Sequence, residues 1–102
     1  MTVESGTGTG VRLRVPRVLA PDLAGEREVV LPVPADGRLR GLLDALRASH
    51  PALERRVRDE TGALRRFVNV YVDGLDARRL DGLATPVGEG QAVEVIQSVA
   101  GG

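Results

Sequence analysis

A leucine pattern typical of one amphipathic helix lies between two groups of alternating apolar residues that are typical of strands. The apolar face of the helix repeats at the i, i+3, i+4, i+7 spacing and comprises Leu39, Leu42, Leu43 and Leu46. Asp36 is expected to be the N-cap of this helix, and Pro51 is expected to end it at His50. A lone helix among strands buries its apolar face against a sheet, so the sequence predicts an α+β fold.

Before the helix, the alternation of apolar residues predicts two strands joined as a hairpin. The first strand covers residues 11–15, and its inward residues are Val11, Leu13 and Val15. Pro16 predicts the end of this strand or a position at the sheet edge. The second strand covers residues 28–33, and its inward residues are Val29, Leu31 and Val33. The turn-rich segment 20–26 connects the two strands.

After the helix, the sequence predicts a shorter helix and then a strand that ends in a tight turn. Residues 52–58 are expected to form the shorter helix, with Leu53 and Val57 facing inward. In the strand that follows, the inward face comprises Val68, Val70 and Val72, and the outward face comprises Phe67, Asn69 and Tyr71. From the sequence alone, the two aromatic residues are as compatible with a partner surface as with burial.

The dipeptide Asp73-Gly74 predicts a type I′ hairpin turn, because both central residues of that turn need a positive φ. A short strand at residues 76–80 is expected to pair back, and residues 92–98 are expected to form the last strand. The predicted result is a mixed sheet with one main helix packed on one face.

At 102 residues, the chain is expected to contain one domain, formed by residues 11–98. Residues 1–10 consist mainly of Gly, Thr and Ser with little to bury, so they are predicted to form a disordered N-terminal arm. Residues 99–102 are predicted to form a flexible C-terminal tail.

The composition excludes several kinds of chemistry and of partner. The formal net charge is 0, so nucleic acid and anionic membrane surfaces exert no general attraction. Cysteine is absent, which excludes disulfides, thiolate metal sites and cysteine nucleophiles. All 14 basic residues are arginine, so the chain offers no side-chain amine for an isopeptide bond. No signal peptide or apolar run of roughly 20 residues is evident, and a cytoplasmic location is therefore expected.

Few side chains are candidates for catalysis or metal binding. His50, the only histidine, is expected at the surface or at a helix end, with Ser49 pointing elsewhere on the helix. The carboxylates, such as Asp59 and Glu60, are scattered in a way typical of solvated surface and of no metal site. Three arginine pairs could face an acidic partner but lack the interleaved aromatics of a nucleic-acid surface: Arg55/Arg56, Arg65/Arg66 and Arg78/Arg79.

The last four residues, Val99, Ala100, Gly101 and Gly102, are the remaining candidate for a reactive group. Extended, they reach at most about 13 to 14 Å, enough to enter a narrow channel in another protein. Without a Cβ, the two glycines let channel walls close on the backbone and let a nucleophile approach the terminal carbonyl. A frayed terminus or an expression scar is the alternative interpretation.

The chemistry open to such a tail begins at its carboxylate. Adenylation with ATP would convert the carboxylate into an electrophile, and attack by sulfide or persulfide would then give a thiocarboxylate. In a chain without cysteine, this terminal acyl group is the place where transferable sulfur can be held. Ordering four residues costs about 4 to 8 kcal/mol, so the folded body is expected to dock on the partner as well.

Residues 11–102 resemble the ubiquitin-like sulfur carriers of the ThiS/MoaD type. The most specific motifs are "FVNVYVDG", "GLATPV" and the final "VAGG", and together they are most similar to the CysO-type carriers of cysteine biosynthesis. The resemblance implies a β-grasp fold and a thiocarboxylate at Gly102, preceded in the channel by Gly101. It also implies docking through an apolar sheet surface, for which the candidates are Phe67, Leu83 and Ile96.

The resemblance also implies the partners of such a carrier. They are a ubiquitin-activating-type adenylyltransferase that consumes the ATP, a sulfur donor, and an enzyme that uses the thiocarboxylate, such as a pyridoxal-phosphate-dependent sulfhydrylase. The carrier would be a protein co-substrate with no cofactor of its own. Gln97-Ser98 stands where relatives usually carry a proline, which leaves the final user of the sulfur open. Alternatives are the small subunit of molybdopterin synthase, a ubiquitin-like protein modifier and a plain interaction domain.

Overall fold

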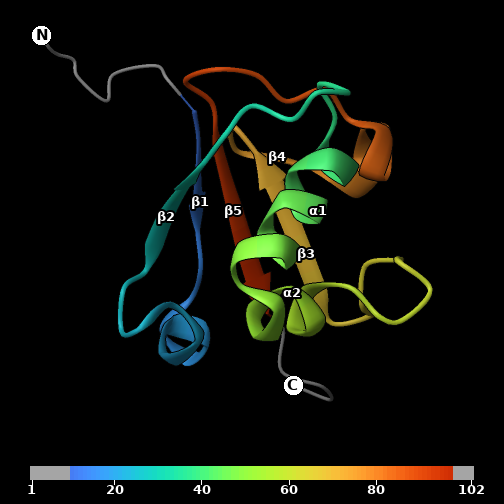
Figure 1. Ribbon diagram of the computed structural model, residues 1–102. Helices are drawn as coiled ribbons and strands as arrows, with labels where there is room; N and C mark the ends of the chain where they lie inside the picture. Colours follow the sequence, from blue (N-terminus) through green and yellow to red (C-terminus); the bar gives the residue numbers. More distant parts are fainter. Residues whose placement is uncertain (1–9, 98–102) are drawn as a thin grey trace, which may run out of the picture.

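The computed structural model describes residues 10–97 and contains a five-stranded sheet with two α-helices and three short 3₁₀-helices (Figure 1). In chain order the elements are β1 (Val11–Arg14), η1 (Arg17–Leu23), β2 (Glu28–Leu31), α1 (Leu39–Ser49), α2 (Pro51–Val57), β3 (Val68–Val72), β4 (Leu75–Asp76), η2 (Ala77–Arg79), η3 (Gly82–Ala84) and β5 (Ala92–Gln97).

The strands lie in the order β2-β1-β5-β3-β4. The last strand, β5, therefore occupies the centre of the sheet, parallel to β1 and antiparallel to β3. The outer pairs β1/β2 and β3/β4 are antiparallel hairpins. This mixed arrangement agrees with the predicted sheet.

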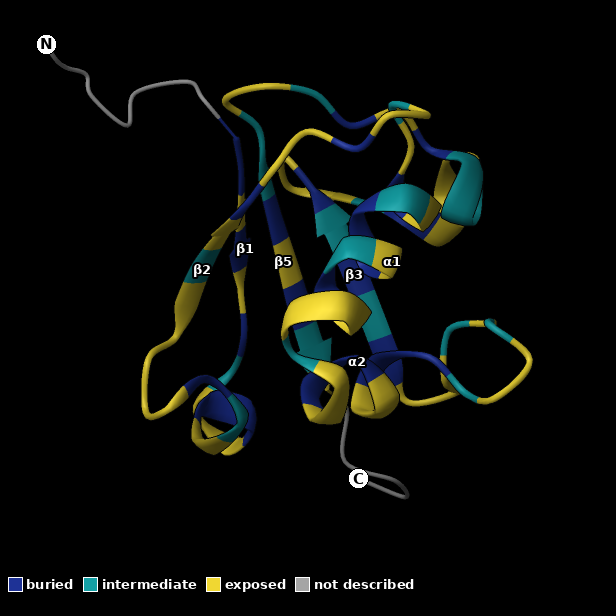
Figure 2. Cartoon of the chain, viewed as in Figure 1, coloured by how far each residue is buried: buried dark blue, intermediate teal, exposed yellow. Residues whose placement is uncertain are grey.

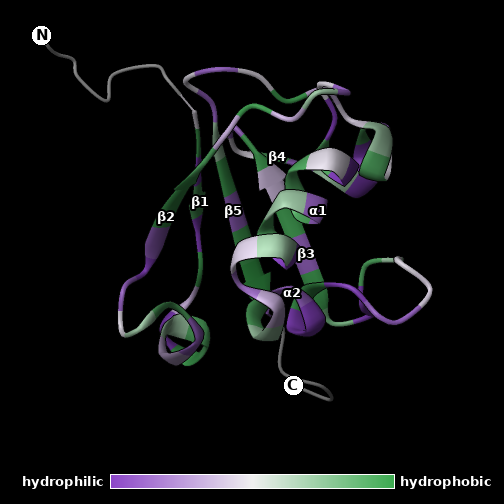
Figure 3. Ribbon diagram, viewed as in Figure 1, coloured by the Kyte–Doolittle hydropathy of each residue, from purple (hydrophilic) through white to green (hydrophobic). Residues whose placement is uncertain are grey.

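The hydrophobic core lies between the sheet and α1, which crosses one face of it (Figures 1 and 2). All four leucines of the predicted helical face are buried. The core residues of β3 and β5 alternate with more exposed ones, and hydrophobic and hydrophilic segments alternate along these strands (Figure 3). The buried strand residues that face α1 include Val11, Leu13, Val68, Val70, Val72, Val93 and Val95.

The main helix begins at Leu39, two residues later than an N-cap at Asp36 would require, and that prediction is wrong. Arg38 is the N-cap, and the carboxylate of Asp36 instead accepts the N–H of Arg38 at 3.0 Å. The first N–H of the helix, that of Leu39, has no partner within the helix and donates instead to the backbone carbonyl of Thr85 at 2.8 Å. A tertiary acceptor thus replaces the expected local cap.

The hairpins differ in detail from their predicted lengths. Strand β2 ends at Leu31, and Val33 is 40% exposed, because Pro32 interrupts the ladder between them. The connection between β1 and β2 was predicted to consist of turns, but it contains the 3₁₀-helix η1. Strand β4 has only two residues, since the carboxylate of Asp76 caps η2 by accepting the N–H of Arg78.

The type I′ turn after β3 is confirmed. Asp73 has a φ of 48° and Gly74 a φ of 85°, so both central residues are left-handed as that turn requires. Helix α2 occupies Pro51–Val57, one residue earlier than predicted, with Leu53 and Val57 buried. No helix within residues 10–97 is both long and apolar enough to cross a membrane.

Candidate functional site

Strand β5 is the element that leads to the predicted reactive tail. Val93 and Val95 are fully buried against the core, and the strand has a hydrogen-bonded neighbour on each side. The candidate residues Val99, Ala100, Gly101 and Gly102, which make up the predicted tail, lie outside the described residues, as do residues 1–9 of the predicted arm at 1–10. Gly10, the last residue of that arm, is described and is buried. The structure therefore defines the base from which the tail starts.

The beginning of β5 is fixed by Asp73, in the turn after β3. Its carboxylate accepts the N–H of Ala92 at 3.0 Å and the side-chain amide of Gln91 at 2.9 Å. In the other direction, the N–H of Asp73 donates to the carbonyl of Ala92 at 2.8 Å. These bonds stabilise the ionised form, and the one from Ala92 contributes most to holding the pKa of Asp73 below its usual value.

The end of β5 lies beside the beginning of β3. Gln97 pairs with Val68, and Ile96 pairs with Asn69. Phe67 directly precedes Val68 and is 44% exposed, while Ile96 is half-buried. The structure thus brings two of the predicted docking residues, Phe67 and Ile96, to the same end of one strand pair.

Arg78 holds this end of the strand pair together. Its guanidinium donates to the carbonyl of Val68 at 2.7 Å and to the side-chain oxygen of Asn69 at 2.6 Å. It also donates to the carbonyl of Arg65 at 2.9 Å, and so spans the turn that contains Phe67. Arg78 therefore serves the internal structure of the chain, a role that the arginine pairs in the sequence did not reveal.

Leu83 lies away from Phe67 and Ile96. It belongs to η3, which contacts α1, and it packs half-buried against the core. The sequence could not distinguish this position from the sheet surface, because "GLATPV" has no strand alternation to assign a face. The surface at the end of β5 consequently includes Phe67 and Ile96 without Leu83.

The sheet face opposite α1 is mostly polar. One registered row crosses all five strands and comprises Glu28, Arg14, Glu94, Tyr71 and Asp76. The two outer members on β1 and β2 form a loose ion pair with a nitrogen–oxygen distance of 3.7 Å. Tyr71 is half-buried within this row, so it is neither part of the core nor fully exposed to solvent.

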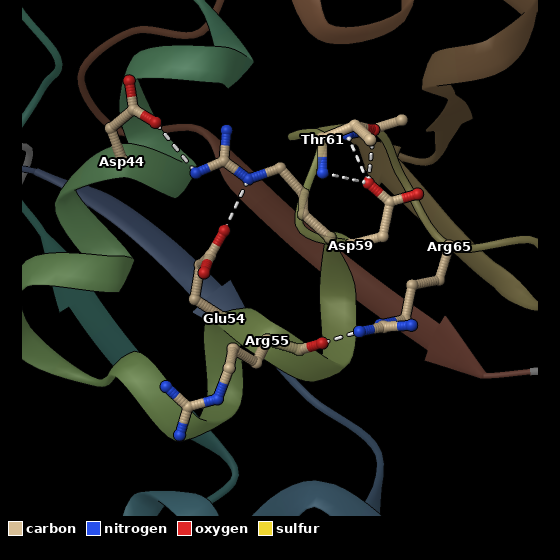
Figure 4. A network of polar contacts seen from close by, with 8 residues as sticks. Asp44, Glu54, Arg55, Asp59, Thr61 and Arg65 are labelled. Carbon is tan, nitrogen blue, oxygen red and sulfur yellow. Dashed lines mark hydrogen bonds and ion pairs between the residues drawn. The ribbon is translucent and has the colours of Figure 1, made fainter.

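An ion cluster around the buried side chain of Arg58 joins α1 to α2 (Figure 4). The guanidinium of Arg58 donates to Glu54 at 2.7 Å and to Asp44 at 2.8 Å. The side chains of Arg58 and Glu54 are only 4% and 6% exposed, so the prediction of uniformly solvated carboxylates is wrong for Glu54. Their i, i+4 spacing on a helix was the available signal.

The loop after α2 is closed by the carboxylate of Asp59 (Figure 4). It accepts hydrogen bonds from the hydroxyl and the N–H of Thr61 and from the N–H of Ala63. The Thr61 hydroxyl is the main cause of a pKa below the usual value for Asp59. Loop, α1 and α2 together line a hollow of about 700 Å³.

The prediction that Ser49 points away from His50 is wrong. The hydroxyl of Ser49 lies 2.8 Å from Nδ1 of His50. His50 has left the helical conformation, with φ −139° and ψ 69°, so the usual angular separation of helix neighbours does not apply. Within residues 10–97, no three His, Asp or Glu side chains gather in a group that could hold a metal ion.

Known proteins resemble this chain over nearly its whole length. The sequence model of the ThiS family matches residues 20–102. The sulfur carrier protein CysO of Mycobacterium tuberculosis H37Rv is 35% identical over 94 residues, which cover 90% of this chain and 98% of that protein. Small archaeal modifier protein 3 of Haloferax volcanii is 33% identical over 81 residues, which cover 79% and 87% of the two chains.

Solved structures agree with these sequence similarities. A chain in the BexX/CysO complex of Amycolatopsis orientalis superposes with a TM-score of 0.79 at 29% identity, covering 90% of this chain and 99% of that one. H. volcanii small archaeal modifier protein 1 superposes with a TM-score of 0.74 at 32% identity, covering 90% and 100%. The ubiquitin-like β-grasp fold implied by the motifs is therefore confirmed.

Proposed function

Because this chain belongs to the ThiS family, we propose that it is a sulfur carrier protein whose reactive group is the terminal carbonyl carbon of Gly102. The observation that carries the proposal is the position of β5. A central strand, bonded to a neighbour on each side, leads directly into the segment that ends in the two glycines. The match to the ThiS family also extends to residue 102.

The proposed cycle has two steps at this carbon. First, the carboxylate of Gly102 attacks the α-phosphorus of ATP, which forms an acyl adenylate and releases pyrophosphate. Second, sulfide or a persulfide sulfur attacks the acyl carbon, and AMP leaves with the electron pair of the broken C–O bond. A persulfide donor then needs a thiol to reduce the resulting disulfide and free the thiocarboxylate. Cysteine is absent from the chain, so both donor and thiol come from other molecules.

The chain acts in this scheme as a protein co-substrate of other enzymes. A ubiquitin-activating-type adenylyltransferase binds the ATP, and a second enzyme uses the thiocarboxylate. The CysO chain of A. orientalis forms a complex with BexX, and this supports the proposal that the present chain also acts by binding partner enzymes. For the second enzyme we favour a pyridoxal-phosphate-dependent sulfhydrylase that makes cysteine, on the ground of the similarity to CysO.

The docking surface that we propose lies at the end of β5. Phe67 and Ile96 supply its apolar area, and Arg78 fixes the turn on which Phe67 stands. Val99 and Ala100 would then enter the partner's channel ahead of Gly101 and Gly102. Docking of a rigid body offsets the entropy lost when the tail becomes ordered.

Intact-mass spectrometry tests the proposal. The full chain is incubated with ATP, its activating enzyme and a sulfide source, and a mass increase equal to the replacement of one oxygen by sulfur is expected. A variant that lacks Gly101 and Gly102 is the matched control and should remain unchanged. A wild-type chain that gains no sulfur while the enzyme consumes ATP on it would contradict the proposal.

Conjugation to other proteins is the second candidate function, since the chain is 33% identical to a small archaeal modifier protein. In that case Gly102 would form an isopeptide bond with a lysine of a target protein. Immunoblots under denaturing and reducing conditions should then reveal adducts of higher mass that disappear when Gly101 and Gly102 are deleted. The chain itself has no lysine, so side-chain-linked polymers of it are not expected.

A further inference from the structure

The hollow of about 700 Å³ between α1, α2 and the loop at 59–63 has a lining rich in charge (Figure 4). Five arginines and four carboxylates line it, which gives a formal charge of +1. It lies on the helix side of the molecule, whereas the docking surface proposed above lies at the end of β5. The proposed sulfur chemistry makes no use of it.

The negative charges of this lining are largely engaged within the protein. Glu54 and Asp44 both accept hydrogen bonds from Arg58. Asp59 accepts three hydrogen bonds within its own loop and has Arg65 nearby, an attraction that contributes to its lowered pKa. Among the four carboxylates of the lining, the exposed Glu60 is the one for which the described residues provide no hydrogen bond or ion pair.

The positive charges are distributed differently. Arg40 and Arg47 lie on α1 and Arg55 lies on α2, and all three are exposed. Within residues 10–97, no ion pair includes any of the three. The hollow therefore has two exposed guanidinium groups beside it that can meet a ligand with carboxylates, those of Arg40 and Arg47, whereas the guanidinium of Arg55 points away from Arg58 and Asp59 (Figure 4).

Arg58, at the buried base of the hollow, offers a different kind of contact. A guanidinium has five N–H donors, and the described structure occupies two of them, toward Glu54 and Asp44. The side chain is only 4% exposed, so an acceptor for the remaining donors has to enter the hollow. Two carboxylates already adjoin it, and a third would be repelled, so a neutral peptide carbonyl fits this position better.

We propose that this hollow binds an extended acidic peptide segment of a partner protein. The carboxylates of the segment pair with Arg40 and Arg47, and its backbone carbonyls accept hydrogen bonds from Arg58. This combination favours a peptide over a compact inorganic anion, which has charge but no neutral carbonyl. The site would give a partner protein a second binding surface on the folded domain, separate from the C-terminal tail.

An NMR titration of the full-length ¹⁵N-labelled chain with a capped hexaglutamate peptide tests the proposal. Saturable shifts are expected at residues 40–47 and 54–63, and the affinity should fall as salt is raised. The double variant Arg40→Gln/Arg47→Gln should bind about three- to tenfold more weakly, the loss expected for two exposed ion pairs. Arg12→Gln/Arg17→Gln removes the same charge elsewhere and should bind almost as well as the wild type.

Three results would overturn the proposal. One is the absence of saturable shifts at low salt, and another is an equal loss of affinity in both double variants. The third is binding of inorganic tripolyphosphate at the same residues as tightly as the peptide, which would indicate an anion site without peptide specificity. No ATP or activating enzyme is present in this titration, so its outcome is independent of the sulfur-carrier proposal.

Discussion

Asp73 links the turn after β3 to the beginning of β5 through its backbone and its carboxylate. Its ionised form is stabilised on folding, so the folded-state pKa lies below the ordinary value of 3.8. A depressed pKa contributes stability that is present above the unfolded-state pKa and is lost as the pH falls toward the folded-state pKa. The contribution is therefore full at pH 7 and disappears in acid.

Asp73→Asn should accordingly lower the free energy of unfolding at pH 7 and have a smaller effect at about pH 3 and below. Urea denaturation of both proteins across this range measures the difference. Glu89→Gln, at an exposed position in the turn before β5, is the matched control and should change little at any pH. A loss of stability in Asp73→Asn that is equal at pH 7 and pH 3 would show that the carboxylate's charge is irrelevant.

A substitution at Gly74 tests the backbone conformation of the same turn. Its φ of 85° strains any residue with a Cβ, although no atom lies within 4 Å of the added carbon. Gly74→Ala should therefore cost about 1 to 2 kcal/mol of unfolding free energy. At Gly88, where φ is not in the left-handed region and the nearest contact is an ordinary 3.9 Å, Ala should be tolerated within about 0.5 kcal/mol. Equal costs at both positions would refute the turn assignment.

At the scale of elements, the Asp44–Arg58–Glu54 cluster connects α1 to α2. Removing one member of a buried ion pair leaves a charge without its partner, and Arg58→Met should cost about 3 kcal/mol by thermal or urea unfolding. The double variant Glu54→Leu/Arg58→Met removes both buried charges and should be more stable than Arg58→Met alone. If the double variant is the less stable of the two, the cluster is not held by charge compensation.

Elements with strong periodicity could be predicted from the sequence, and those shaped by distant contacts could not. The leucine spacing of α1 and the alternation of β3 each define a buried face without knowledge of the rest. The start of α1 depends on the carbonyl of Thr85, 46 residues after Leu39, and no local pattern encodes that contact. Likewise, "DGLDARRL" contains no residue pattern that separates a two-residue strand from the following 3₁₀-helix.

The candidate site was predictable to a similar extent. The family resemblance pointed to the end of the chain and to Phe67, Leu83 and Ile96, of which the fold brings only Phe67 and Ile96 to one end of the β3/β5 pair. It could not reveal that Arg78 reaches across from η2 to three oxygens of that region, because this contact depends on how the chain returns after β4. The charge-lined hollow likewise depends on the packing of α1 against α2.

At the scale of the whole molecule, we propose that the folded body docks on partner enzymes and that the C-terminal residues carry the reactive group. Phe67→Ala/Ile96→Ala should raise the KM of the activating enzyme for this chain about tenfold and leave kcat nearly unchanged, because we propose that these side chains contribute to docking alone. Val18→Ala removes a similarly exposed apolar group in η1 and should leave both constants unchanged. A loss confined to kcat would place Phe67 and Ile96 outside the docking surface.

The position of the transferred sulfur within the chain decides whether the terminal carbonyl carbon of Gly102 is the reactive group. After incubation with ATP, the activating enzyme and sulfide, the intact chain is fragmented in the mass spectrometer and its C-terminal fragments are compared with those of the untreated chain. Every fragment that contains Gly102 should carry sulfur in place of one oxygen, and fragments that end before Gly102 should be unchanged. Sulfur on any other residue, or its absence from Gly102 in a chain that supports sulfur transfer, would show that the reactive group lies elsewhere.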